Sequence, residues 1–516
     1  MSRLPTVHPT VVHMLVRAAD SAPEREAVAC RDERLTYREY LRCVAWFADE
    51  LLGLGVEQKR VALILGNSVD ICVAMFATHA SHAQAVPLNP LYTAREFREL
   101  LEDAAPHVVL YEEDKRELIE PLVDELGIPH KICIGNGERR LTMWRYAADR
   151  PLPPLPTSED LATLQYTGGT TGRAKGANLR HGAIATNVSQ REALLPTRKD
   201  GERLLCVMPL FHIYAAAMCL HNMVYAAGTL VIVPRYTPDT VFDLLAAEGI
   251  TIIAGSPTLF TSLLAHERFA QVEFSDLYVS YSGSAALPEE LLRQWEAATG
   301  APVVEGYGQS ETGPVLTFNP FLGVRKPGSV GVPLPDTDIQ IVDLDNGAEP
   351  LAVGDQGEIR VRGPQMMMGY RNRPDENAMV MRDGWLYTGD VGEFDTDGYL
   401  YIRGRKKEMA KVSGFNVFPR EIEEVLYLHP AVREAAAVRV PDEYRGELVK
   451  AFVALHTGAS ATAEELSAHC HENLAKYKVP ATVSIVDELP KTAVGKIDKN
   501  RLRERLAQAQ ALSARS

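Results

Sequence analysis

The alternation of helix-like segments with short β-branched runs constrains the fold of this chain more than any other feature of its sequence. Between Thr36 and about Leu110, the helix-like segment YREYLRCVAWFADELLGLG precedes the strand-like runs RVALIL, AVPL and HVVLY. This order is typical of βαβ units around a parallel sheet. From about Leu204 to Val304 the pattern returns with the runs LLCVMP, GTLVIV, TIIAG and LYVSYSG. We therefore expect an α/β protein with two sheets of this kind.

The length of 516 residues exceeds what one hydrophobic core can organise, so several domains are expected. Past Gly328 the chain becomes rich in strands and turns (GSVGVPLP, DIQIVD, GEIRVRG, GYLYIRG), which predicts a small β-subdomain. Helices are expected again only after Pro419, where helices and strands suffice for a small α+β domain. We place the boundary near Arg405, which divides the chain into a large N-terminal domain, 1–404, and a small C-terminal domain, 405–516.

Composition excludes several classes of protein. Apolar residues make up 46% and charged residues 24%, as in ordinary soluble proteins. A formal charge of −14 gives no attraction to nucleic acid or anionic lipid. The seven cysteines include no CxxC pair, which fits a reducing cytoplasmic compartment. The longest apolar stretch, 215–234, is broken by His221 and Asn222, so no transmembrane segment is expected.

The strongest local signal is YTGGTTGRAKGA, which runs from Tyr166 to Ala177 at the end of a strand-like run. Its glycines let backbone N–H groups approach phosphate oxygens, its threonines add hydroxyl donors, and Lys175 adds a positive charge. It is not a Walker loop, because Gly176 follows Lys175 where that pattern needs Ser or Thr. The segment predicts a phosphate-binding loop, with an ordinary Gly-rich turn as the alternative.

Three further motifs follow in order. EGYGQSETGP places Ser310 beside Glu311 at the end of a strand, and a single carboxylate there suffices for Mg²⁺ that keeps waters and phosphate oxygens. WLYTGD ends in Asp390, expected at a loop tip, where a carboxylate can accept both ribose hydroxyls. The last motif is PKTAVGKIDK, which contains Lys496.

With these four motifs in this order, nearly the whole chain resembles the adenylate-forming superfamily of acyl-CoA synthetases, 4-coumarate:CoA ligases, firefly luciferases and peptide-synthetase adenylation domains. The resemblance implies an ATP-dependent carboxylic acid:CoA ligase that forms an acyl-adenylate and releases AMP and pyrophosphate. The implied cofactors are ATP, Mg²⁺ and coenzyme A. It further implies that the C-terminal domain is mobile and closes in one orientation for adenylation and in another for thioester formation.

The resemblance also implies roles for individual residues. Lys496 matches the lysine that touches the α-phosphate and carboxylate during adenylation, Glu311 matches the Mg²⁺ ligand, and Lys407 matches the domain hinge. The phosphate loop matches Thr167, Gly168, Gly169, Thr170, Thr171, Gly172 and Lys175, with Thr170 as a second candidate metal ligand. The other nucleotide contacts fall on Gly283, Ser284, Ala285, Glu305, Gly306, Tyr307, Ser310, Asp390 and Arg405. The CoA path and thioester step fall on Lys411, Gly414 and Arg235.

The acid is the least constrained substrate. His212 in PLFHIYA matches a residue at the mouth of the acyl pocket, and Ala216 would leave a channel open beside it. Gly283 and Gly308 are expected to widen the same wall. PLFHIYA resembles aryl-CoA ligases, whereas GYGQSETGP with RKPGSVGVPLPDTDIQIVD resembles bacterial fatty-acyl-CoA synthetases. We favour a medium- or long-chain fatty acid, with an aryl acid as the alternative.

Other functions are weighed against this one. A fatty acyl-AMP ligase that feeds a carrier protein would normally carry an insertion around 354–370, and the sequence has none. A non-catalytic ATP-binding protein would be expected to have lost Lys496, Glu311 or Asp390, and all three are present. The motifs do not exclude a luciferase-like oxygenase, and a homodimer is compatible with the sequence.

Overall fold

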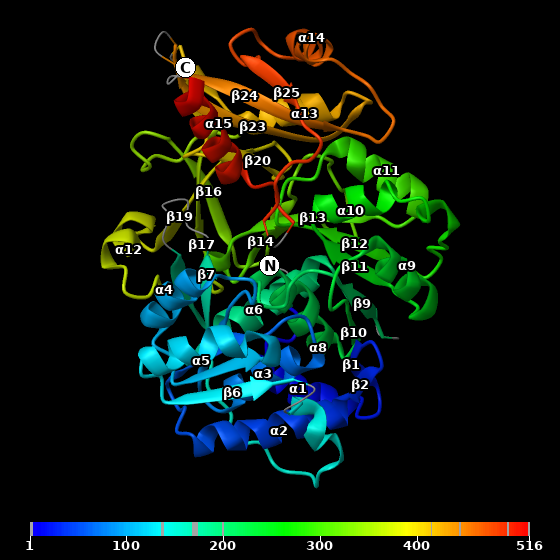
Figure 1. The fold of residues 1–516 in the computed structure, drawn as a ribbon, viewed down its shortest axis with the longest axis vertical. Helices are drawn as coiled ribbons and strands as arrows, with labels where there is room; N and C mark the ends of the chain where they lie inside the picture. The colour runs from blue at the N-terminus through cyan, green and yellow to red at the C-terminus, as the bar shows by residue number, and fades with distance from the viewer. Residues whose placement is uncertain are drawn as a thin grey trace.

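The computed structural model describes residues 4–135, 139–167, 174–198, 201–413, 415–442, 445–492 and 495–513. Two large α/β sheets form the lower part of the molecule, and a smaller C-terminal sheet lies at the opposite end (Figure 1). A third, β-rich part lies between them and carries β16, β17 and β19. This is the α/β architecture that the alternating pattern predicts.

The first sheet has six strands in the order β6-β5-β3-β4-β7-β8, all parallel except β8. Thr36, Ser68 and Thr93 cap three of its helices through their side-chain hydroxyls; in the longest one, Thr36 and Glu39 form a reciprocal capping box. The strands are β3 (Arg60–Ile64), β4 (Gln84–Pro87), β5 (Val108–Glu112), β6 (His130–Ile134), β7 (Leu161–Thr167) and β8 (Lys175–Arg180). The helices of this part are α2 (Tyr37–Gly53), α3 (Val69–Ala80), α4 (Ala94–Ala104), α5 (Arg116–Glu125) and α6 (His181–Leu194).

The second sheet has nine strands in the order β15-β14-β13-β12-β11-β9-β10-β1-β2. The strands are β1 (Glu26–Cys30), β2 (Glu33–Thr36), β9 (Arg203–Cys206), β10 (Thr229–Ile232), β11 (Ile252–Gly255), β12 (Val279–Ser282), β13 (Val303–Gly308), β14 (Val315–Phe318) and β15 (Val332–Pro333). Its helices are α1 (Val11–Ser21), α7 (Ile213–Ala215), the π-helix η3 (Ala216–His221), α8 (Asn222–Ala226), α9 (Pro238–Ala247), α10 (Pro257–Leu264) and α11 (Glu289–Thr299).

The second sheet corrects two expectations about how the chain is divided. Strand β1 pairs in parallel with β10, with Val28 opposite Leu230, so the first sheet is nested inside the second in sequence. The segment GSVGVPLP, expected in the β-subdomain, contributes β15 to this large sheet through its pairing with β14. Hydrophobic pattern alone does not show which partner a strand will take, because a buried strand presents the same apolar residues to either neighbour.

The remaining strands form two five-stranded sheets. The third sheet contains β16 (Asp338–Val342), β17 (Gly357–Arg362), β18 (Met381–Arg382), β19 (Trp385–Phe394) and β20 (Leu400–Arg405). The C-terminal sheet contains β21 (Ala410–Val412), β22 (Phe415–Val417), β23 (Val432–Asp442), β24 (Gly446–Leu455) and β25 (Thr482–Ile485). Around these sheets lie α12 (Pro374–Val380), α13 (Pro419–Tyr427), α14 (Ala463–Asn473) and α15 (Lys499–Ser513).

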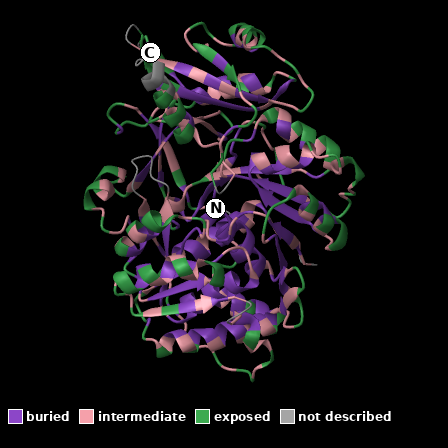
Figure 2. Cartoon of the chain, in the orientation of Figure 1, coloured by how far each residue is buried: buried purple, intermediate pink, exposed green. Residues whose placement is uncertain are grey.

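The chain changes from the third sheet to the C-terminal sheet between Arg405 and Ala410. Helix α12 differs from the expectation that no helix occurs in this region before Pro419. A proline in its first turn favours the start of this helix. Buried residues concentrate on the central strands and the helix faces against them (Figure 2). Within the described ranges, no helix is long and apolar enough to cross a membrane.

Candidate active site

The expected phosphate loop joins two strands of the first sheet. Thr167 is the last residue of β7 and Lys175 is the first residue of β8, and they are paired in the sheet. The intervening candidates Gly168, Gly169, Thr170, Thr171 and Gly172 lie outside the described residues. The segment that contains Tyr370 packs beside β8, since the Arg371 N–H donates to the Gly176 carbonyl at 2.8 Å.

Tyr370 connects the phosphate loop to the expected metal ligand. Its hydroxyl donates to Glu311 Oε1 at 2.7 Å, and Lys175 Nζ lies 5.4 Å from the centre of its ring. Glu311 belongs to the 3₁₀-helix η5 (Ser310–Thr312), which follows β13, so Ser310 and Glu311 do lie at a strand end. Tyr370 lies outside the four sequence motifs, and an aromatic residue between Gly369 and Arg371 is its only signal in the sequence.

Asp390 lies at the centre of a dense polar cluster. Tyr307 Oη donates to its Oδ2 at 2.5 Å, and Gln309 Nε2 donates to the same oxygen at 2.6 Å. Arg405 Nε lies 2.7 Å from Asp390 Oδ1. The neighbouring Asp390 carboxylate raises the pKa of the Arg405 guanidinium, and burial and Asp390 together raise that of Tyr307. Sequence reasoning missed Gln309, although it lies inside the GYGQSE motif.

The backbone around Asp390 differs from the expectation of a loop tip. Asp390 lies inside strand β19 and is paired with Arg405 on β20. Gly389, with φ +71°, precedes it and bends the strand without ending it. Two neighbouring strands therefore hold the carboxylate and the guanidinium in register, which gives a more rigid arrangement than a loop would.

Lys496 reaches this cluster from the C-terminal part of the chain. Burial and the nearby Arg405 cation lower the pKa of Lys496 to about 8, whereas Asp390 acts in the opposite direction. Burial, and to a lesser degree the Lys496 charge, lowers the pKa of His212 to about 3, so this imidazole is neutral. In Figure 1 the segment before α15 runs from the C-terminal sheet down toward β13 and β14. The structure thus brings Lys496, His212, Asp390 and Arg405 together.

The expected adenine segment is the turn after β12. Ser284 has φ +70°, an uncommon backbone conformation for a residue with a side chain, and Ala285 is exposed. Glu305 is buried, and its Oε1 accepts a hydrogen bond from the Leu287 N–H at 3.0 Å. Burial raises the Glu305 pKa to about 7. The side chain of Glu305 therefore holds the far end of this turn against β13.

The expectation that Gly283 and Gly308 widen the acyl channel is wrong. A Cβ at Gly283 would lie 2.6 Å from Tyr214 Cε2, and one at Gly308 would lie 1.8 Å from the Pro314 carbonyl oxygen. Neighbouring atoms already occupy the space beside both glycines. These glycines therefore allow close packing and do not enlarge a channel. Gly306 acts in the same way, since a Cβ there would lie 2.6 Å from the Phe318 ring.

The residues at the expected channel mouth lie on one helical segment. His212 caps the short helix α7 and its Nδ1 accepts from the Tyr214 N–H at 3.2 Å. The Ala216 N–H donates to the His212 carbonyl at 3.1 Å, so Ala216 lies one turn further on the same face. Ala216 is buried and begins the π-helix η3, a type of helix that is frequent at functional sites.

The expected hinge is an exposed turn between two anchored neighbours. Lys406 Nζ pairs with Glu358 of the third sheet at 2.7 Å. On the other side, Glu408 lies 3.5 Å from Arg503 of α15. Lys407 lies between them and lines a cavity of about 440 Å³ between the turn and the C-terminal sheet.

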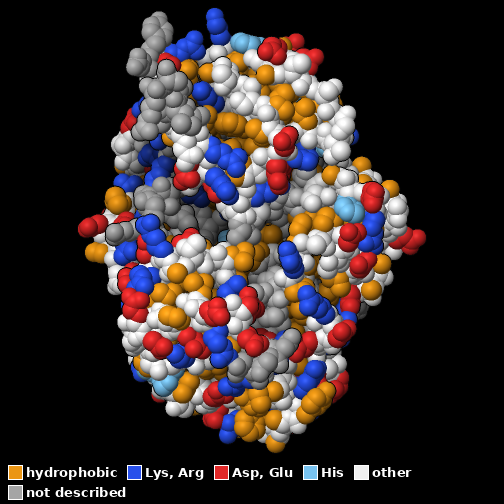
Figure 3. All heavy atoms as spheres, in the orientation of Figure 1, with side chains coloured by type: hydrophobic (Ala, Val, Ile, Leu, Met, Phe, Trp, Pro, Cys, Tyr) orange, Lys and Arg blue, Asp and Glu red, His pale blue; other side chains and the backbone are white. Residues whose placement is uncertain are grey.

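The expected CoA residues lie apart from the Lys496 cluster. Lys411 is exposed on the hairpin of β21 and β22, where its backbone N–H donates to Glu447 Oε2 at 2.7 Å. Arg235 is exposed after β10, and Gly414 lies outside the described residues. No contact among the residues described joins Lys411 or Arg235 to Lys496 or Asp390. On the face in Figure 3, Lys and Arg side chains gather on the C-terminal part above a hollow at mid-height.

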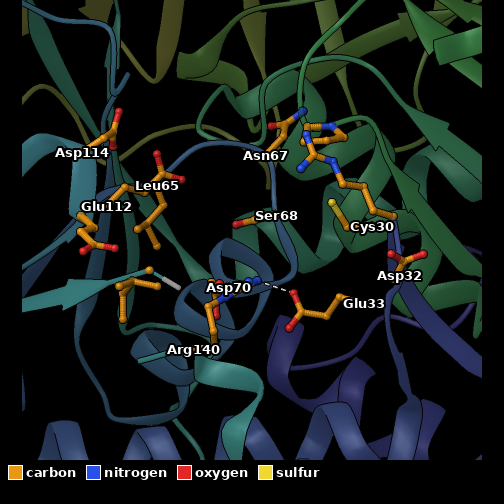
Figure 4. A pocket seen from close by; sticks show the side chains of 15 residues that line it. Cys30, Asp32, Glu33, Leu65, Asn67, Ser68, Asp70, Glu112, Asp114 and Arg140 are labelled. Atoms are coloured by element: carbon orange, nitrogen blue, oxygen red, sulfur yellow. Dashed lines mark hydrogen bonds and ion pairs between the residues drawn. The ribbon is translucent and has the colours of Figure 1, made fainter. Parts of the chain in front are cut away.

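A separate cavity of about 440 Å³ lies where β3, β5 and β6 end (Figure 4). Arg140 bridges Asp70 and Glu33 on its wall. The other charged lining residues are Arg31, Asp32, Glu112, Glu113 and Asp114. Carboxylates outnumber guanidinium groups on this wall, which disfavours an anionic nucleotide.

Comparison with known proteins agrees with this geometry. The family model of AMP-binding enzymes matches residues 15–371, and that of the AMP-binding enzyme C-terminal domain matches residues 421–496. The chain is 36% identical to a long-chain-fatty-acid–CoA ligase of Bacillus subtilis (strain 168), with 97% of this chain and 95% of the relative covered. It is 35% identical to a feruloyl-CoA synthase of Amycolatopsis sp., with 95% and 98% covered.

Among solved structures, the anthranilate CoA ligase AuaEII in complex with anthranoyl-AMP superposes with a TM-score of 0.91 at 28% identity, and 98% of this chain and 99% of that chain are covered. The chain belongs to the family of AMP-binding, adenylate-forming enzymes. Within this family it is an acid–thiol ligase, which uses ATP and CoA to form an acyl-CoA through an acyl-adenylate.

Proposed function

We propose that the protein activates a medium- or long-chain fatty acid, with Lys496 acting in the first half-reaction and Mg²⁺ held at Glu311. The observation that supports this most strongly is the position of Lys496 beside the Asp390–Arg405 pair, where both charges act on its pKa. A cation there can offset the charge that develops on the α-phosphate when the carboxylate attacks it. No protein nucleophile is needed for this step.

The residues around Glu311 fit a magnesium ion bound with nucleotide phosphates. Among the described residues, the Glu311 carboxylate receives one hydrogen bond, from the neutral Tyr370 hydroxyl, which leaves lone pairs for a cation. No group of three or more His, Cys, Asp or Glu residues in the described ranges could hold a metal alone. The ion would then be shared with phosphate oxygens, whose charge it would neutralise, and Thr170 is proposed as a further ligand.

In the proposed nucleotide site, Asp390 accepts hydrogen bonds from the ribose hydroxyls, and the Arg405 guanidinium, 2.7 Å away, holds that carboxylate in place. Ser284 and Ala285 border the base. Lys175 and the phosphate loop bind the leaving pyrophosphate, and closure of the C-terminal domain excludes water from the acyl-adenylate. A later rotation about Lys407 would replace Lys496 with the hairpin that contains Lys411, which would face the CoA thiol.

The fatty acid is supported by the relative from Bacillus subtilis, which matches almost the full length of the chain. His212 and Ala216 then border the acyl channel, and neutral His212 adds no charge to it. An aryl acid is the second candidate, because a feruloyl-CoA synthase is nearly as similar. The Tyr214 ring lies two residues after His212, so an aromatic side chain stands next to the residue expected at the channel mouth.

The acid is tested by measuring kcat/KM for AMP formation with acetate, octanoate, laurate, palmitate, benzoate and 4-coumarate in the presence of CoA. Each additional buried CH₂ is worth about 0.8 kcal/mol, so kcat/KM should rise several-fold per carbon until the channel ends. A clear preference for benzoate or 4-coumarate over every fatty acid would replace the fatty acid by the aryl alternative.

The role of Lys496 is tested with Lys496→Ala. This variant should lose acyl-adenylate formation, followed as pyrophosphate release, because it removes the cation proposed to stabilise the attacked α-phosphate. It should still convert presynthesised acyl-adenylate and CoA into thioester. An equal loss of both half-reactions would contradict a role limited to the first.

A further inference from the structure

The hairpin that contains Lys496 is hydrogen-bonded to helix α10 of the N-terminal part through a threonine hydroxyl. Thr258 Oγ1 donates to the Gly495 carbonyl at 2.7 Å, although the two residues are separated by 237 positions in the sequence. Gly495 and Lys496 share a peptide bond, so a donor that holds the Gly495 carbonyl also places the Lys496 backbone. The contact thus links the body of the enzyme to the residue proposed to act on the α-phosphate.

The described residues of the hairpin are joined to one another by backbone hydrogen bonds. Lys491 and Ile497 pair as antiparallel neighbours, and the Thr492 N–H donates to the Lys496 carbonyl at 2.7 Å. The Gly495 N–H donates back to the Thr492 carbonyl at 2.9 Å. These bonds tie both Gly495 and Lys496 to Thr492, so a shift of the Gly495 carbonyl also shifts the backbone of Lys496.

Thr258 is itself firmly placed. It lies in the first turn of α10, directly after β11, and its branched Cβ restricts rotation of the side chain. Ser256 Oγ lies 2.7 Å from Thr258 Oγ1. Because the single proton of the Thr258 hydroxyl goes to the Gly495 carbonyl, Ser256 must be the donor in this pair. Buried Ser256 therefore orients the Thr258 hydroxyl toward the hairpin.

Gly495 permits the close approach. Its φ is +76°, and a Cβ added there would lie 3.1 Å from Thr258 Oγ1 and 3.4 Å from Ser256 Oγ. A side chain at this position would crowd both hydroxyls as well as strain the backbone. The two hydroxyls and the glycine therefore form one fitted contact.

We propose that Thr258 is a positioning residue that docks the Lys496 hairpin for acyl-adenylate formation. The proposal rests on the proposed function, since it requires that Lys496 acts in the first half-reaction and leaves for the second. The Thr258–Gly495 bond then belongs only to the adenylation orientation and breaks when the C-terminal domain rotates. Thr258 touches neither the substrate nor the reacting atoms, and acts through the position of Lys496.

Thr258→Val keeps the shape of the side chain and removes the donor, and Thr258→Ser restores the donor. With the most active acid of the substrate series, Thr258→Val should lower kcat for pyrophosphate release about 5- to 10-fold, the effect of one net hydrogen bond. Thioester formation from presynthesised acyl-adenylate and CoA should stay within about twofold of wild type, a spread expected for a residue without a role in that step. Thr258→Ser should recover most of the adenylation rate.

Three results would overturn the proposal: unchanged adenylation in Thr258→Val, an equal loss in both half-reactions, or a Thr258→Ser variant as slow as Thr258→Val. Lys496→Ala is measured in parallel to separate this proposal from the proposed function. If Lys496→Ala abolishes adenylation while Thr258→Val does not slow it, only the docking role fails. If Lys496→Ala leaves adenylation intact, the role of Lys496 fails first and the docking role with it.

Discussion

At the scale of single residues, burial and the neighbouring Arg405 cation both lower the pKa of Lys496. Its pKa of about 8 lies well below that of an ordinary lysine. The free enzyme therefore carries a cation at this position at neutral pH and loses it in mildly alkaline solution. Since the proposed role needs the cation, the charge state should govern the first half-reaction.

We predict that kcat/KM for acyl-adenylate formation falls as pH rises through about 8, by about tenfold per pH unit. The sign follows from the charge, because Lys496 is protonated below this pH and neutral above it. Pyrophosphate release measured from pH 6.5 to 9.5 checks the profile. In Lys496→Arg the guanidinium stays charged, so the decline should disappear whatever the absolute rate. A decline that persists in Lys496→Arg would assign it to another group.

The residues of the candidate site were largely predictable from sequence, whereas their partners were not. Asp390, Glu311 and Lys496 lie in motifs whose order carries the family resemblance, and the structure brings Asp390 and Lys496 together. Tyr370 and Gln309 were missed, because a neutral hydroxyl or amide next to a charged residue has no distinctive spacing. The filled space beside Gly283 could not be foreseen either, since a glycine in a sequence is compatible with an opening or with close packing.

At the scale of elements, three helices bury a group of histidines. His79 of α3, His181 of α6 and His221 of η3 pack together, with 5.1 Å between the ring centres of His79 and His181. Burial lowers the pKa of His79 to about 4 and that of His221 to about 3, and it lowers that of His181 as well. His79 and His221 are therefore neutral in the folded protein at pH 5, where unfolded histidines are protonated.

This helix packing should lose stability in acid. A depressed pKa makes the unfolded chain bind more protons than the folded one below about 6.5, so stability falls as pH drops from there toward about 4. At pH 5 the cost is about 2 kcal/mol for each such histidine. We predict that His221→Phe reduces the fall in Tm between pH 7 and pH 5 by about 2 °C.

Phenylalanine suits this position because neither His221 ring nitrogen has a hydrogen-bond partner in the described part of the chain. Differential scanning calorimetry at both pH values makes the measurement. His130→Phe serves as the matched control, because that ring lies at the start of β6, where it is only partly buried and outside the histidine cluster. The same pH dependence in His221→Phe and wild type would exclude the buried cluster as its source.

Most strands and helices could be predicted as elements, since their hydrophobic periodicity is local. Their neighbours could not, because pairing depends on contacts between distant residues. Strand β1 joins the second sheet, β15 leaves the expected β-subdomain, and Asp390 lies inside β19 where a loop was expected. Helix α12 is only seven residues long, too short for a periodic pattern to reveal it.

At the scale of the whole molecule, the turn 406–408 is held on both sides. Lys406 is anchored to Glu358 of the third sheet, and Glu408 to α15 through Arg503. A rotation of the C-terminal domain would therefore concentrate its backbone change at Lys407. The boundary at Arg405 and the hinge at Lys407 remain predictions until the two half-reactions are separated.

We predict that Lys407→Pro retains acyl-adenylate formation and loses most thioester formation, because proline fixes φ at the residue that must rotate. The measurement is a single turnover with acid, ATP and CoA, in which acyl-adenylate should accumulate. Lys407→Ala is the control for loss of the side chain and should turn over at a rate close to wild type. Normal overall turnover in Lys407→Pro would remove Lys407 from the hinge.

The nesting of one α/β sheet inside the other imposes an order of events while the chain is being synthesised. All six strands of the inner sheet lie between Arg60 and Arg180, so they can pair soon after leaving the ribosome. The hairpin of β1 and β2 emerges earlier but must wait for β10, since Val28 pairs with Leu230. A two-stranded hairpin is only marginally stable in water, and its free edge invites pairing with other chains. The β1–β2 hairpin therefore keeps an unpaired edge until the chain has been made past Leu230, and during that interval it is a place where nascent chains can pair with one another.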